Sequence, residues 1–76
     1  MFDRITFDPQ IMGGRACIRG LRITVSLVVN LVANGMTPPG IIKEYPALEA
    51  EDIKEALQYA ASLDSEEIRR LMGSRG

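Results

Sequence analysis

The run VSLVVNLVA, from Val25 to Ala33, limits the possible folds of this chain more than any other feature. It is apolar except at Ser26 and Asn30, and Thr24 before it is a suitable N-terminal cap. We expect a helix over Val25 to Asn34 that is apolar around most of its circumference and must be covered on several sides. A chain of 76 residues offers little material for this. We therefore expect a homodimer or an obligate partner to cover part of this helix.

Three more helices are delimited by cap and stop residues. Thr37 followed by two prolines is a start signal, and Pro46 is a stop. Asp64 and Glu67 form the capping pattern of a last helix. Between Pro46 and Asp64 the sequence predicts a further helix, whose apolar residues recur at helical spacing on one face. The expected ranges are Pro38 to Tyr45, Glu49 to Leu63 and Glu66 to Met72, with a frayed tail after the last helix.

The first 24 residues have the pattern of short strands. Ile5 to Phe7 alternates and is ended by Asp8-Pro9. Ala16 to Arg19 and Arg22 to Thr24 are expected to form a small ribbon bent at Gly20. The predicted fold is mainly α, with a small N-terminal β-ribbon followed by a three- to four-helix, homeodomain-like or winged helix-turn-helix domain. We expect one domain, with a ribbon arm at 1–24, a three-helix core at 25–63 and a short helix and tail at 64–76.

The charges are strongly segregated although the net charge is only −1. Residues 1–23 carry four arginines against two aspartates, whereas residues 49–67 carry seven acids against one lysine. Arg15, Arg19 and Arg22 lie on the turn-rich ribbon and can bind phosphate or carboxylate at two points. The alternative is that these arginines pair with acids of the third helix within the same chain. The sequence leaves both interpretations open.

The residue inventory argues against catalysis and against a metal or cofactor. The chain has no histidine and a single cysteine, Cys17, which is expected to be buried in a strand. No segment is long and apolar enough to span a membrane, and no secretory signal is evident. We expect a cytoplasmic protein without enzymatic activity.

The second and third helices have the spacing of a helix-turn-helix, whose later helix enters the DNA major groove. Lys54 and Gln58 are the residues of its exposed face that suit DNA. The first turn of this helix is acidic, which phosphates would repel. A small helical bundle with a solvated acidic face is the alternative interpretation.

Residues 5 to 61 resemble a known family through three stretches: GGRACIRGLRITV, LVANGMTPPGIIKEYPAL and EDIKEALQYAA. The chain resembles the prokaryotic domain-of-unknown-function family four-three-three. The resemblance implies a helix-turn-helix fold and no enzymatic activity. It also implies an antitoxin similar in role to the VapB class, which silences a PIN-like nuclease toxin and represses the shared operon by binding its promoter.

Positions that match the family pattern are Gly14, Arg19, Gly20, Arg22, Gly35, Tyr45 and Pro46. The chain departs from it at Leu21, Ala47 and Glu49, where threonine, histidine and a hydroxyl cap are usual. Glu49 adds an acid to the expected recognition helix, so we expect the ribbon arginines to supply much of any affinity for DNA.

The sequence therefore supports two candidate functions. The first is a dimeric antitoxin that contacts DNA through Arg15, Arg19, Arg22, Lys54 and Gln58. The second is a protein-binding module that does not touch DNA. In both, the C-terminal segment is expected to bind the partner through the apolar side chains Ile68, Leu71 and Met72.

Overall fold

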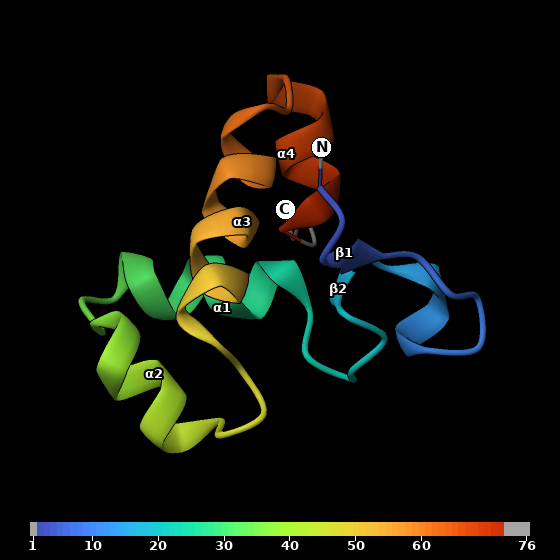
Figure 1. Ribbon diagram of the computed structural model, residues 1–76. Helices are drawn as coiled ribbons and strands as arrows, with labels where there is room; N and C mark the ends of the chain where they lie inside the picture. The colour runs from blue at the N-terminus through green and yellow to red at the C-terminus, as the bar shows by residue number, and fades with distance from the viewer. Residues whose placement is uncertain (1, 73–76) are drawn as a thin grey trace.

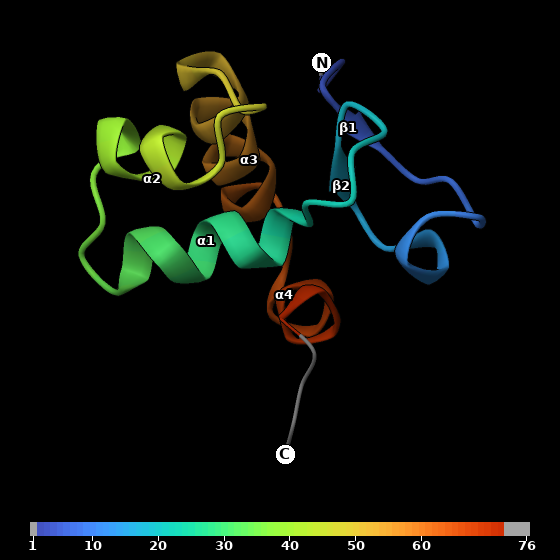
Figure 2. The same cartoon turned by 90° about the horizontal axis from the view of Figure 1, so that it is seen from below.

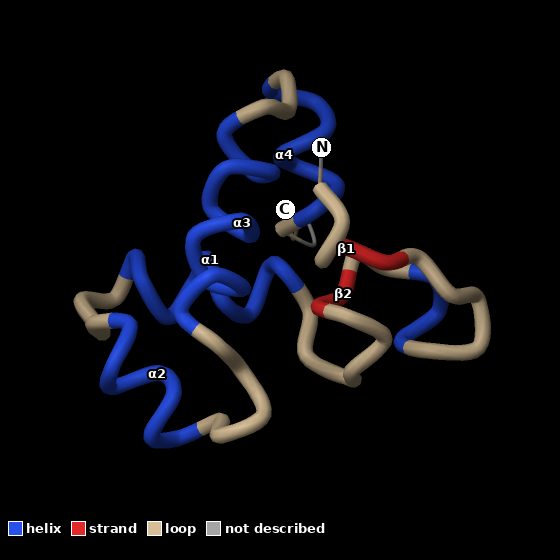
Figure 3. Tube along the Cα trace, viewed as in Figure 1, coloured by secondary structure: helices blue, strands red, loops and turns tan. Residues whose placement is uncertain are grey.

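The computed structural model describes residues 2–72, which form four α-helices beside a small two-stranded sheet (Figures 1 and 3). The expectation of a frayed tail falls on residues 73–76, outside the described residues. In chain order the elements are β1 (Ile5–Thr6), the 3₁₀ turn η1 (Met12–Gly14), β2 (Cys17–Ile18), α1 (Val25–Ala33), α2 (Pro38–Glu44), α3 (Ala50–Ala61) and α4 (Ser65–Leu71).

All four predicted helices are confirmed, with ends within two residues of those expected. The caps explain this agreement. The Thr24 and Thr37 hydroxyls accept hydrogen bonds from the first turns of α1 and α2, at 3.1 and 3.2 Å. Asp64 and Glu67 accept from each other's backbone N–H groups at the start of α4, at 2.8 and 2.9 Å. These bonds satisfy amides that the helices themselves leave free.

The ribbon differs from the prediction in its pairing. β2 pairs antiparallel with β1, with Ile5 opposite Ile18. The expected strand Arg22–Thr24 is wrong, because only Thr24 bridges back to Cys17. The reason is local: Thr24 is already the cap of α1, so the chain leaves the sheet after one bridge.

The core lies where α1 packs against α3 and α2, beside the two-stranded sheet (Figures 1 and 2). The largest completely enclosed apolar side chains come from β2, α1, α2 and α3: Ile18, Val25, Val28, Ile41 and Ile53. Burial of such side chains is the main favourable contribution to folding.

α1 is covered only in part. Val25 and Val28 are buried, whereas Leu27, Val29, Leu31 and Val32 are half-buried. Three of these four, Val29, Leu31 and Val32, still pack against the core cluster. A homodimer or partner that covers the rest of the apolar surface of α1 stays a prediction. Within residues 2–72 no helix combines the length and apolar character needed to cross a membrane.

Candidate nucleic-acid and partner interface

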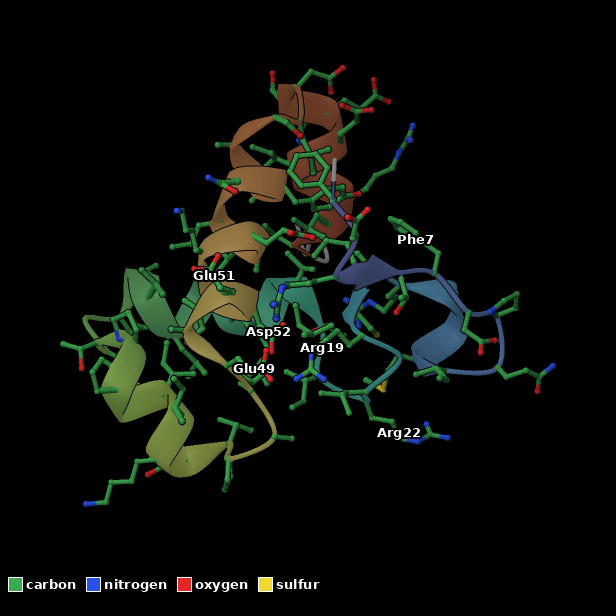
Figure 4. All side chains as sticks on the ribbon, viewed as in Figure 1. Phe7, Arg19, Arg22, Glu49, Glu51 and Asp52 are labelled. Carbon is green, nitrogen blue, oxygen red and sulfur yellow. The ribbon has the colours of Figure 1, made fainter. Side chains whose placement is uncertain are left out.

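A buried carboxylate joins the ribbon to α3. The side chain of Asp52, in the first turn of α3, has no exposed surface. The Nε and Nη2 atoms of Arg19 donate to its two carboxylate oxygens at 3.0 and 2.9 Å, and Nη1 of Arg4 donates at 2.8 Å. Figure 4 shows the Asp52 and Arg19 side chains pointing toward each other between the two elements. The fork of Arg19 thus holds the carboxylate at two points, the strongest geometry for such a pair.

The turn after β2 aims Arg19 at this carboxylate. Arg19 and Gly20 both have positive φ angles, 43° and 72°, and the Leu21 amide donates to the Ile18 carbonyl at 2.7 Å. Two central residues with positive φ define the tight turn that suits a twisted hairpin, and glycine makes it accessible at the second position. The left-handed backbone of Arg19 is held by this turn and by its own N–H, which donates to the Arg4 carbonyl at 2.7 Å.

Further hydrogen bonds connect the ribbon to the α2–α3 turn. Nη2 of Arg19 donates to the carbonyl of Ala47 at 2.7 Å. Arg4 donates its backbone N–H to Glu55 at 2.6 Å and its Nη1 to Glu49 at 2.8 Å. Asp52 also accepts from the Glu49 N–H at 2.8 Å, so it caps the helix in which it lies. We refer to Arg4, Arg19 and Asp52 as the arginine anchor.

The two arginines neutralise the buried charge of Asp52 and change the pKa values of all three side chains. Burial alone would raise the pKa of Asp52, but the hydrogen bonds from Arg19, Arg4 and the Glu49 backbone outweigh it and lower the pKa to about 2. The hydrogen bonds to Asp52 in turn raise the pKa of Arg19, and those to Glu49 and Asp52 raise the pKa of Arg4. Arg19 therefore pairs with an acid of the third helix of the same chain, as the second interpretation of the sequence expected.

The other predicted DNA-contacting residues remain available at the surface. Arg15 and Arg22 are exposed and form no ion pair within residues 2–72. Lys54 and Gln58 lie one turn apart on α3 and are also exposed. Figure 4 shows Arg22 pointing away from the arginine anchor, on the far side of it from Glu51. The structure thus engages Arg19 in an ion pair within the chain and leaves Arg15 and Arg22 without one among residues 2–72.

A pocket of about 290 Å³ lies between the ribbon, the end of α3 and α4. Tyr59 forms part of its wall and packs edge-on against Phe2 and Phe7, with ring centroids 5.4 and 6.2 Å away. Leu71 lines the pocket as well, and Ile68, one turn earlier, is 38% exposed. Met72 is half-buried. The C-terminal apolar residues are therefore divided between a pocket wall and the surface.

Comparisons with known proteins give the family of this chain and a solved structure of similar fold. The sequence profile of the family described as "Protein of unknown function (DUF433)" matches residues 5–60. The chain belongs to the DUF433 family. The crystal structure of a DUF433 member from Anabaena variabilis ATCC 29413 has a similar fold, with a TM-score of 0.80 at 32% identity over 93% of this chain and 69% of that one.

The chain also matches part of a longer relative. The uncharacterised protein y4eO of Sinorhizobium fredii (strain NBRC 101917 / NGR234) is 35% identical over 69 residues. The match covers 91% of this chain but 31% of y4eO. The chain therefore spans about a third of the length of that relative.

Sequence reasoning missed Arg4 and the burial of Asp52. The alternative interpretation, a solvated acidic face on this helix, does not apply to Asp52, whose side chain is buried. Its position is informative, because it lies one turn before Ala56 on the buried side of α3. A carboxylate on a buried face needs a cationic partner. Nothing in the sequence identifies Arg4 as that partner, since 48 positions separate the two residues.

The depressed pKa of Asp52 predicts acid sensitivity of the DUF433 domain. The carboxylate is easier to protonate in the unfolded chain, so its contribution is complete above the ordinary pKa and is lost as the pH falls through the folded value. We expect Asp52 to account for a loss of about 2 kcal/mol of unfolding free energy between about pH 5 and pH 2. Urea titrations of the wild type and of Asp52→Asn at several pH values would measure it. Parallel pH profiles for the two proteins would contradict the prediction.

Proposed function

We propose that this DUF433 domain is the helix-turn-helix part of an antitoxin of a type II toxin–antitoxin system. It binds a PIN-like nuclease toxin and represses its own operon by binding promoter DNA. The resemblance to the family implies both activities. Such a protein acts in the cytoplasm, where the toxin and the operon lie.

The observation that carries the proposal is the fixed placement of α3. Residues 45–49 link α2 to α3, and the arginine anchor fastens this link and the start of α3 to the ribbon. An element that reads DNA must be held rigidly, because the contacts to base edges depend on its register. The anchor supplies that rigidity in a small domain.

The anchor also weakens the main argument against DNA binding. Two of the acids at the start of α3, Glu49 and Asp52, are paired with Arg4 and Arg19. Glu51 is left as the exposed acid of the first turn of α3 without an ion pair within residues 2–72. The negative charge that a phosphate backbone would meet is therefore smaller than the sequence suggests.

A non-catalytic role is consistent with the chemistry of the chain. No histidine is present. Burial raises the pKa of the Cys17 thiol, which keeps it protonated and unreactive. Binding surfaces, rather than a nucleophile or a general base, are the features that support a function.

The test is fluorescence anisotropy with a duplex from the protein's own promoter and a scrambled duplex, across a salt series. We expect tighter binding to the promoter. The log–log salt slope should fall by about 0.9 in Arg22→Ala and in Lys54→Ala for each phosphate that the variant no longer neutralises. Arg69→Ala, an exposed arginine on α4, is the matched control and should leave the slope unchanged. Sedimentation equilibrium of the same sample measures whether the binding species is the expected homodimer.

A protein-binding module that does not touch DNA is the second candidate. The half-buried apolar side chains of α1 and the exposed Ile68 favour it, because such surfaces are typical of protein contacts. Equal, weak binding to both duplexes would select this candidate and contradict the first.

A further inference from the structure

We propose that the pocket between the ribbon and α4 is a docking site for an acidic segment of a protein partner. The partner inserts one large apolar side chain against Tyr59 and Leu71 and places a carboxylate beside Arg15 and Arg70. The inference rests on the partner-binding part of the proposed function and names the chemistry that the partner must present.

The floor of the pocket is apolar and formed by distant parts of the chain. Ala16 comes from the ribbon, Tyr59 and Leu63 from the end of α3 and the residues after it, and Leu71 from α4. Phe7 closes one side and is nevertheless 57% exposed. A large aromatic ring left so exposed beside an apolar hollow is typical of a surface that another molecule covers.

The rim of the pocket carries a positive balance of charge. Arg15 and Arg70 line it together with one acid, Glu67. The Glu67 carboxylate already accepts a hydrogen bond from the Asp64 N–H at 2.9 Å, so it is committed to capping α4. Arg15 has no ion pair within residues 2–72. Two guanidinium groups against one engaged carboxylate favour a negatively charged ligand.

Arg70 can change its partner at little cost. It pairs with Glu66 at 3.1 Å, but the two side chains are 73% and 69% exposed. An ion pair so open to water contributes little to stability and exchanges readily for a carboxylate of a ligand.

The size and lining of the pocket indicate a peptide rather than a nucleic acid or a metabolite. A volume of about 290 Å³ lies just below the usual range of small-molecule sites and suits one anchoring side chain. Burial together with Glu67 raises the pKa of Tyr59, which keeps its ring neutral. Tyrosine and arginine are also the residue types enriched where a partner's anchor is buried.

The test is an NMR titration of the ¹⁵N-labelled full chain with a defined probe, acetyl-Asp-Leu-Phe-Glu-amide. We expect saturable shifts at the amides of Arg15, Ala16 and Leu71. The neutral analogue acetyl-Asn-Leu-Phe-Gln-amide should bind about tenfold more weakly, because it lacks both charge-assisted contacts. A thymidine tetranucleotide should leave these amides unchanged.

Two variants assign the effect to the pocket. Phe7→Ala and Arg15→Ala should each weaken binding of the acidic peptide by about fivefold. Arg69→Ala removes the same charge from α4 outside the pocket and should leave the affinity unchanged within about twofold. The same spectra report whether each variant is folded, and exposure of Phe7 and Arg15 means that folding should not depend on either side chain.

Three results would each overturn the proposal: equal affinity for the acidic and neutral peptides, saturable shifts confined to another surface, or shifts at the pocket with the tetranucleotide and not with the peptide. The promoter assay is independent of these outcomes. Peptide binding without promoter binding would retain the docking site and select the protein-binding module. Promoter binding without peptide binding would retain the DNA-binding function and remove the docking site alone.

Discussion

Replacing Asp52 with Ala should lower the free energy of unfolding by about 3 kcal/mol, because it leaves two arginines without their buried partner and removes a helix cap. The lower end of the usual range applies, since the side chains of Arg4 and Arg19 are 30% and 35% exposed and water can reach them. A domain of this size has a total stability of about 4–11 kcal/mol. The substitution should therefore remove a large part of it and lower the melting temperature by about 12–24 °C.

The matched control is Glu51→Ala, which removes the same charge from the same turn of α3. Glu51 is exposed and forms no ion pair within the described part of the chain, so its loss should change stability by no more than about 0.5 kcal/mol. Urea denaturation of both variants at pH 7 gives the comparison. If Asp52→Ala costs no more than Glu51→Ala, the arginine anchor does not stabilise the fold.

Ile53→Ala should also lower the free energy of unfolding by about 3 kcal/mol, for a different reason. The Ile53 side chain is 1% exposed and packs in the cluster that joins α3 to the rest of the core. Truncation removes buried methyl groups and leaves a cavity that closely packed neighbours fill only partly. Chemical denaturation measures the loss.

Ile68→Ala provides the control for this second prediction, because the same atoms are removed from a side chain that is 38% exposed. We expect a change within about 1 kcal/mol. Equally small losses at the two positions would mean that Ile53 does not fix α3 in the core. Equally large losses would mean that α4 packs more tightly than the structure indicates.

The helices can be predicted from the sequence because their signals are local. A cap hydroxyl at Thr24 or Thr37, or the Asp64–Glu67 pair, acts within a single turn. The strand at Ile5–Thr6 and the burial of Cys17 follow from local patterns in the same way. The pairing of β2 with β1 does not, because residues 7–16 separate the two strands and no local turn signal sets their register.

The candidate site depends more on tertiary structure. The sequence alone determined that Arg15, Arg19 and Arg22 are concentrated on a turn-rich ribbon and that the acids gather in the last two helices. It left open whether those charges meet each other or a partner. Only the folded chain decided this, by burying Asp52 where Arg19 could reach it and leaving Arg22 outside that reach. The physical reason is that a buried carboxylate must be neutralised. The distances between atoms in the folded chain determine which cation does so. Composition and periodicity carry no information about those distances.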